Sequence, residues 1–271
     1  MTATKAFLAG IVLLAGLVVL ALSVGAQGFG WGDGGSLVLL RSPRVLAALA
    51  AGLALGIGGA AQQGVFRNPL ADPGLTGVFG GALFGIALLL GIFPEAAWQR
   101  AWCIPAAAFT GALATSALLV VLGGGGATSR LLLAGLGLNA FTAAGTLVIA
   151  SRSGESRELL TNGAYGDWLG MATLELIWLP VLLTALAAGA STCLVGQVAF
   201  IGLLAPHLAR RLVGPRHAKV LPLSALLGGA LLLGADTLGR GLWPQAPLSA
   251  AAVTAVFGAP LFIWMARGRH E

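Results

Sequence analysis

Charged residues are scarce in this chain, at 9% of its 271 residues, against about 25% in a typical soluble domain. There are only two cysteines, and no set of Cys, His, Asp and Glu residues has the spacing of a metal site. The sequence has neither a glycine-rich phosphate-binding loop nor a nucleophile paired with a base. These absences disfavour a soluble domain and a metal or cofactor site, and we expect the chain not to be an enzyme.

Long hydrophobic runs take the place of the missing charge. Hydrophobic residues make up 58% of the chain, the mean hydropathy is +0.94, and residues 6–26 contain no charge. A bilayer core about 30 Å thick needs about 20 apolar residues of helix, which this first run supplies. A signal peptide is the alternative for it, but no polar domain follows, so we interpret it as a membrane-spanning helix.

Similar apolar runs continue to the end of the chain. We expect an all-α fold in a single domain, residues 1–271, forming a polytopic transmembrane helix bundle with about eight or nine membrane segments. Glycine, with 42 residues, favours close packing, because small residues let membrane helices approach one another. The predicted segments are 6–26, 45–65, 74–93, 101–122, 131–150, 174–195, 196–213, 220–238 and 250–266.

Basic residues are distributed unevenly between the two ends of these segments. One side collects nine basic and two acidic residues, and the other collects six basic and seven acidic ones. Cytoplasmic loops are enriched in Lys and Arg, so we place the first side, with both termini, in the cytoplasm. The same rule accounts for the net charge of +6 without a nucleic acid partner. The nine basic residues are Lys5, Arg67, Arg130, Arg210, Arg211, Arg216, Lys219, Arg267 and Arg269.

Six stretches carry motifs that follow one another in order along nearly the whole chain. They are 41–49 (RSPRVLAAL), 63–78 (QGVFRNPLADPGLTGV), 129–139 (SRLLLAGLGLN), 198–210 (VAFIGLLAPHLAR), 228–240 with its ADTLGR ending, and 257–264 (FGAPLFIW). With these motifs the chain resembles the FecCD-type permeases of bacterial ABC importers, which carry iron-siderophores, haem or cobalamin. Haem is our first expectation among these cargoes, because residues 132–139 and 214–217 look most like haem permeases.

The resemblance implies a multi-pass permease subunit of the type II ABC importer kind in the bacterial cytoplasmic (inner) membrane. It implies a homodimer or pseudo-dimer of ten-helix subunits, with the translocation path along the dimer axis. The other partners would be an ATP-binding subunit on the cytoplasmic side, a periplasmic substrate-binding protein outside, and membrane lipid. ATP hydrolysis would take place in the partner chain, so this chain would have no catalytic residue.

The chain departs from the family in one region. In the family, a cytoplasmic loop with two short helices joins the sixth and seventh spans and docks on the ATPase. Here residues 178–189 run directly into 191–197, so this coupling loop has no counterpart. Two full crossings would put the basic loop outside, and a re-entrant hairpin over 174–200 fits the charge distribution better. The alternative function is therefore a degenerate permease-like protein that no longer couples to an ATPase.

Three arginines lie at the outer ends of predicted segments. By resemblance, Arg41, Arg44 and Arg240 form pockets for carboxylates of the binding protein, and a guanidinium suits such charge-assisted, bidentate bonds. Two other interpretations stay open. Arg41 and Arg44 could anchor a helix end at the membrane interface, and Arg240 could pair with Asp236 one helical turn earlier.

On the inner side the resemblance suggests a gate and a surface for the ATPase. The gate residues would be Asn68, Pro69, Leu70, Thr128 and Ser129, for which loop and helix-cap roles are the alternative. The residues facing the ATPase would be Arg210, Arg211, Arg216, His217 and Lys219.

A few further polar and sulfur-containing residues lie within the apolar runs. We expect Asn139 to form a hydrogen bond between helices, with a contact in the transport path as the alternative, and Gln62 and Gln63 leave the same choice. Cys103 and Cys193 are expected to be small buried apolar side chains.

Overall fold

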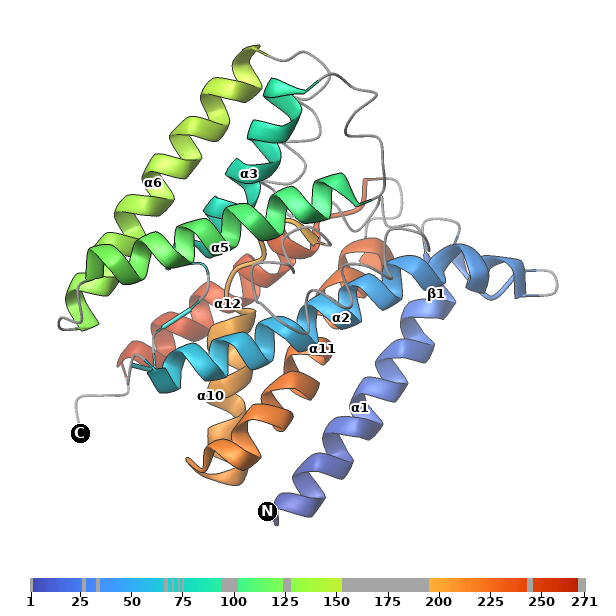
Figure 1. Cartoon of the computed structure of the whole chain (residues 1–271). Helices are drawn as coiled ribbons and strands as arrows, with labels where there is room; N and C mark the ends of the chain where they lie inside the picture. Colours follow the sequence, from blue (N-terminus) through green and yellow to red (C-terminus); the bar gives the residue numbers. More distant parts are fainter. Residues whose placement is uncertain are drawn as a thin grey trace.

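The computed structural model describes most of the chain as a helical bundle (Figure 1). The described residues are 2–25, 28–32, 35–65, 68–69, 71–72, 74, 76–93, 102–123, 128–152, 195–242 and 246–267. Their helices are α1 (Ala3–Ser23), α2 (Ser36–Val65), α3 (Val78–Ile92), α5 (Cys103–Gly123), α6 (Thr128–Arg152), α10 (Ile201–Val213), α11 (His217–Leu242) and α12 (Ala250–Arg267). The expected all-α, polytopic fold is confirmed. The predicted segment 174–195 lies outside the described residues apart from Val195.

Five helices in the described part are long and apolar enough to cross a membrane, namely Ala3–Ser23, Ser36–Gly64, Cys103–Leu122, Arg130–Arg152 and His217–Leu242. Each has at least 20 residues, which at 1.5 Å per residue reaches about 30 Å. Helices α3 and α12 are also apolar but shorter. The long hydrophobic runs of the sequence thus form the helices that they predict.

Helix α10 begins later than the sequence predicts. The predicted segment 196–213 is helical only from Ile201, because Gly196 and Phe200 have positive φ angles of 73° and 69°. This left-handed conformation cannot continue a right-handed helix. The 13 residues of α10 extend for about 20 Å, so this helix does not by itself cross a bilayer core about 30 Å thick.

A short β-hairpin follows α1 at the end of the bundle where α2 begins. Strand β1 (Val24–Gly25) pairs antiparallel with β2 (Gly28–Phe29), so the helix ends at Ser23 rather than at the predicted residue 26. The indole N–H of Trp31 donates a hydrogen bond to the Ser23 hydroxyl at 2.8 Å and fastens the hairpin to the helix end.

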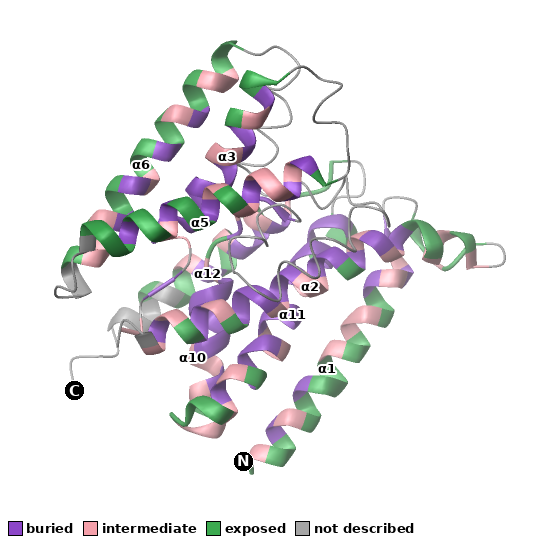
Figure 2. Cartoon of the chain, viewed as in Figure 1, coloured by how far each residue is buried: buried purple, intermediate pink, exposed green. Residues whose placement is uncertain are grey.

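The helices form two groups that share one apolar core (Figure 1). Helices α1, α2, α10 and α11 pack together, α3, α5 and α6 form the second group, and α12 packs on α10 and α11. Buried side chains such as Leu55, Ile86 and Leu232 belong to one continuous cluster that includes both groups. Figure 2 shows α2 and α11 largely buried at the centre, whereas α1 and α6 expose much of their surface.

Glycines set the distance between the two central helices. A Cβ atom on Gly52 of α2 would lie 2.5 Å from the Gly228 carbonyl oxygen of α11, and one on Gly56 would collide with the Ser224 carbonyl. The backbones therefore touch, as expected where small residues line a contact between membrane helices. This contact aligns α2 and α11 along their length and brings their polar residues to the same level.

Candidate functional site

A buried aspartate joins two of the three predicted docking arginines. Asp236 of α11 is fully buried. Its Oδ1 accepts hydrogen bonds from Nε and Nη2 of Arg44 at 2.9 and 2.7 Å, and its Oδ2 accepts one from Nε of Arg240 at 3.0 Å. The Asp236–Arg240 pair is the one that the spacing of one helical turn predicts. The spacing does not predict the bond to Arg44, which comes from α2.

Arg240 also fastens the end of α1. Its Nη1 donates to the Val24 carbonyl at 2.8 Å and its Nη2 to the Ala21 carbonyl at 3.3 Å. With Nε on Asp236, all three nitrogens have partners inside the protein, and the side chain is 7% exposed. Arg240 therefore ties α1 to α11.

Arg41 holds the β-hairpin in a similar way. Its Nη1 donates to the carbonyls of Leu22 and Gly30 at 2.8 and 2.7 Å, and its Nη2 donates to the Gly28 carbonyl at 3.1 Å. A Cβ atom on Gly25 would lie 2.6 Å from the Nε of Arg41, so glycine makes room for this buried guanidinium. Arg41 thus serves the local fold through both terminal nitrogens.

Arg44 is the most exposed of the three arginines. Its side chain is 20% exposed, and among the described residues its Nη1 has no hydrogen-bond partner. We call Arg41, Arg44, Asp236 and Arg240 the arginine cluster. With three guanidinium groups and one carboxylate, it carries two positive charges in excess. A second carboxylate could therefore be bound here without leaving a buried charge unpaired.

The basic residues predicted to face an ATPase lie at the opposite ends of α2 and α11. Arg211, Arg216 and His217 are exposed, and Lys219 is half-buried. Arg210 is also half-buried, and its Nη2 donates to the Gln63 side-chain oxygen of α2. The short turn 214–216 joins α10 to α11, so these side chains form one basic surface, which we call the basic end.

The predicted gate residues lie in two places. Asn68 and Pro69 are half-buried in the connection from α2 to α3, where the Asn68 carbonyl accepts a hydrogen bond from the Ala71 amide at 3.1 Å. Thr128 and Ser129 begin α6, and their side chains lie outside the description. Leu70 is not among the described residues. The gate therefore stays a prediction.

Three side-chain amides, the buried Gln63 and the half-buried Asn139 and Gln62, connect helices with neighbouring segments. Asn139 of α6 donates to the Gly74 carbonyl at 2.6 Å, which joins α6 to the segment before α3. Gln63 donates to the Gly202 carbonyl of α10 at 3.3 Å, and Gln62 donates to the Thr76 hydroxyl at the same distance. Cys103 is buried as expected, whereas Cys193 lies outside the described residues.

A cavity of about 880 Å³ lies between α3, α6 and the segments 197–203 and 247–255. Asp72 lines it, is 5% exposed and accepts a hydrogen bond from the Gly74 amide at 2.7 Å. Burial raises the pKa of Asp72 to about 6, and the bond from Gly74 offsets part of that rise. Within the described ranges, no three His, Cys, Asp or Glu residues come together as a metal site.

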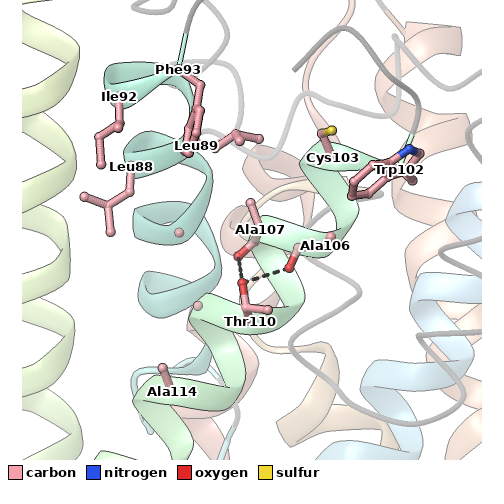
Figure 3. A pocket seen from close by; sticks show the side chains of 12 residues that line it. Leu88, Leu89, Ile92, Phe93, Trp102, Cys103, Ala106, Ala107, Thr110 and Ala114 are labelled. Carbon is pink, nitrogen blue, oxygen red and sulfur yellow. Dashed lines mark hydrogen bonds between the residues drawn. The ribbon is translucent and has the colours of Figure 1, made fainter. Parts of the chain in front are cut away.

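A second, open groove of about 640 Å³ runs between α3 and α5 (Figure 3). Apolar side chains such as Leu88, Phe93 and Trp102 line it. The Thr110 hydroxyl points back to the carbonyls of Ala106 and Ala107 on its own helix, at 2.9 and 3.1 Å, and so is already satisfied. The groove suits an apolar neighbour and offers little to a charged or polar ligand.

The sequence alone does not predict the surroundings of two of the acidic residues described above, Asp236 and Asp72. The bond between Asp236 and Arg44 depends on how α2 and α11 are aligned, and no local pattern signals that alignment. The burial of Asp72 is not signalled either, because a Pro- and Gly-rich stretch reads as a surface turn. The glycines of α2 and α11 are the one sequence signal for the contact that aligns them.

Comparison with known proteins identifies the family. The profile of the FecCD transport family matches residues 11–167 and 159–268. The hemin transport system permease protein of Yersinia pestis is 33% identical over 277 positions, covering 86% of this chain and 83% of the relative. The ferric enterobactin transport system permease protein of Escherichia coli is 37% identical over 272 positions, covering 84% and 80%. The vitamin B12 import system permease protein of Citrobacter koseri is 35% identical over 304 positions, covering 94% and 91%.

The alignment with the vitamin B12 permease has more positions than this chain has residues, 304 against 271, so the relative contains residues that this chain lacks. A solved structure of a metal-chelate type ABC transporter, in an inward-facing conformation, superposes with a TM-score of 0.83. It is 24% identical, and the superposition covers 98% of this chain and 99% of the other, which shows that the fold is the same. The chain belongs to the FecCD transport family.

Proposed function

We propose that this chain is the permease subunit of an ABC importer for an iron chelate, such as haem or a siderophore, or for cobalamin. The observation that carries the proposal is that permeases for haemin, ferric enterobactin and vitamin B12 each match more than four fifths of the chain. Their identities, 33 to 37%, are too similar to favour one cargo. The proposal includes residence in the bacterial cytoplasmic membrane, and haem is the first cargo to test.

Two copies of the chain would form the translocation path. Helices α6 and α12 expose large apolar side chains that need either lipid or a second subunit as a neighbour. We assign a homodimer contact to these two helices, because neither is central in the bundle. The exposed side chains include Leu133, Leu136, Phe141 and Leu147 of α6 and Val256, Phe257 and Ile263 of α12.

The two ends of the bundle would bind different partners. The basic end has the exposed Arg211, Arg216 and His217 and would face the cytoplasm and the ATP-binding subunit, as the positive-inside rule favours. Both termini would then be cytoplasmic. The arginine cluster would face outward, toward a substrate-binding protein that offers carboxylates. ATP would be hydrolysed in the partner chain only.

A second candidate is a permease-like protein that has lost its coupling to an ATPase. The observation that favours it is the shortness of this chain relative to its relatives. We place the missing stretch in the region 174–200, where the coupling loop would be expected. Without that loop, the basic end alone would have to transmit the conformational change of the ATP-binding subunit to the membrane helices.

Reconstitution separates the two candidates. The chain is placed in liposomes with the ATP-binding subunit and the substrate-binding protein of the same system, and uptake of radiolabelled haem, a ferric siderophore and cobalamin is measured. An ATP-binding subunit that cannot hydrolyse ATP is the control. ATP-dependent uptake of one cargo would establish the importer, whereas binding of the substrate-binding protein without uptake would favour the uncoupled protein. If the substrate-binding protein does not bind and no cargo is taken up, both candidates are contradicted.

A further inference from the structure

We propose that Asp236 is a positioning residue, which holds the Arg44 guanidinium so that its free Nη1 meets a carboxylate of a soluble partner. The inference rests on the proposed function and divides the work among the three arginines. Both terminal nitrogens of Arg41 donate to backbone carbonyls, and all three nitrogens of Arg240 are engaged with backbone carbonyls and Asp236, so these two arginines maintain the local fold. Of the three arginines, Arg44 combines partial exposure with a terminal nitrogen, Nη1, that has no hydrogen-bond partner among the described residues.

The geometry of Arg44 leaves one side of its guanidinium available. A guanidinium has five N–H donors in a rigid plane, and a carboxylate can bind along the Nε–Nη2 side or along the Nη1–Nη2 end. Asp236 takes the first of these positions with a single oxygen, Oδ1. The Nη1–Nη2 end is then left for a second carboxylate, and the same arginine can bridge the two.

Asp236 can hold Arg44 in this orientation because it is itself immobile. The carboxylate is fully buried, and its other oxygen is bound to Arg240, which in turn is bonded to the end of α1. Three helices thus determine one position for the Arg44 side chain. An arginine that is already ordered loses less conformational freedom when a partner binds, and this favours affinity.

One substitution distinguishes two roles of Asp236, positioning of Arg44 and a purely electrostatic effect, because the two predict opposite changes in affinity for an acidic partner. Asp236→Asn removes a negative charge from the cluster, so electrostatics alone predicts tighter binding of an acidic partner. Loss of positioning predicts weaker binding, because the amide cannot act as the charged acceptor for both arginines. The two explanations therefore give opposite results.

The first experiment measures the affinity of the full chain, in lipid nanodiscs, for the substrate-binding protein of the same system. We expect Asp236→Asn to weaken binding about tenfold or more, and Arg44→Lys to weaken it too, because lysine keeps the charge but loses the fork geometry. The matched control is Asp33→Asn, which removes an acidic charge from the connection between α1 and α2. It should leave affinity unchanged or slightly higher. Equal or tighter binding by Asp236→Asn, at both low and high salt, would overturn the proposal.

A second experiment needs no partner protein. A dicarbonyl reagent that condenses with the terminal nitrogens of arginine is applied to the nanodisc-bound chain, and modification of Arg44 is followed by mass spectrometry. We expect Arg44 to react several-fold faster in Asp236→Asn, because Nη2 is released, and at the parental rate in Asp33→Asn. An unchanged rate would show that Asp236 does not hold Arg44. If even the parental chain binds no substrate-binding protein, the proposed docking function is wrong, and so is the role of Arg44 as a contact. The rate at which the reagent modifies Arg44 still shows whether Asp236 holds this side chain.

Discussion

Asp236 and Arg44 are 192 positions apart in the sequence, yet the Oδ1 of one lies 2.7 Å from the Nη2 of the other. The ion pair joins the same two helices, α2 and α11, whose backbones touch at Gly52 and Gly228. Close backbone contact brings the two polar side chains within reach, and the ion pair in turn fixes the alignment of the helices. Stability and the proposed docking surface therefore depend on the same contact.

Replacing Arg240 by alanine should destabilise the protein by about 3 kcal/mol, because removal of one partner leaves a buried charge less well paired. The variant also loses the hydrogen bonds to Val24 and Ala21 that tie α1 to α11. Thermal unfolding in detergent measures the change. The control is Arg152→Ala at the exposed end of α6, where we expect less than about 0.5 kcal/mol. Equal effects of the two substitutions would mean that the cluster adds nothing to stability.

The contact between α2 and α11 predicts a position-dependent effect of glycine substitution. Gly56→Ala places a Cβ atom against the Ser224 carbonyl and should cost about 1–3 kcal/mol. Gly16→Ala, on the exposed side of α1, meets nothing within 4 Å and should stabilise by up to about 1 kcal/mol. Melting temperatures of the two variants in the same detergent test this. A stable Gly56→Ala protein would show that the helices can separate at little cost.

The β-hairpin should depend on the space that Gly25 leaves for Arg41. In Gly25→Ala the added Cβ would overlap the guanidinium, so Arg41 must shift away from the carbonyls of Gly28 and Gly30. We expect faster proteolysis within residues 24–32 in a chain whose helices are intact. Gly16→Ala in α1 has open space around it and serves as the control. Equal cleavage rates would contradict the role of Arg41 as a clamp.

Asp72 should make the stability of the chain depend on pH. Burial raises its pKa from 3.8 to about 6, so the folded state binds the proton more tightly than the unfolded state. The contribution of Asp72 to stability is then greatest below pH 4, and this contribution, up to about 3 kcal/mol, disappears as the pH rises through 6. Asp72→Asn keeps an acceptor for the Gly74 amide but cannot ionise. Its stability should lack this contribution to the pH dependence and should be higher than that of the parent at neutral pH, as unfolding at several pH values would reveal.

The sequence predicts the helices well and the polar contacts poorly, for a physical reason. The long run that forms α6 needs only its own hydrophobicity and length to be recognised. The start of α10 depends on the left-handed Phe200, which no composition rule predicts for an aromatic residue. The Asp236–Arg240 pair is local and predictable from spacing, whereas the bond to Arg44 depends on the packing of distant helices. The same difference explains why three similar arginines prove to have unlike surroundings.

Under the second candidate function, the permease-like protein that has lost its coupling, coupling of this chain to an ATPase should be weak or absent. One relative, the vitamin B12 permease, contains residues that this chain lacks, and this candidate assigns the missing stretch to the region 174–200, where the coupling loop of the family is expected. The surface that an ATPase could contact is then the basic end, and an interface below about 1,200 Å² belongs to weak, transient contacts. We expect ATP hydrolysis by the reconstituted complex to be unaffected by the substrate-binding protein.

Charge reversal at the exposed residues Arg211 and Arg216 should release any ATPase that does bind. Robust ATP-dependent uptake that disappears in the Arg211→Glu, Arg216→Glu double variant would contradict this prediction, and would assign the coupling role to the turn between α10 and α11.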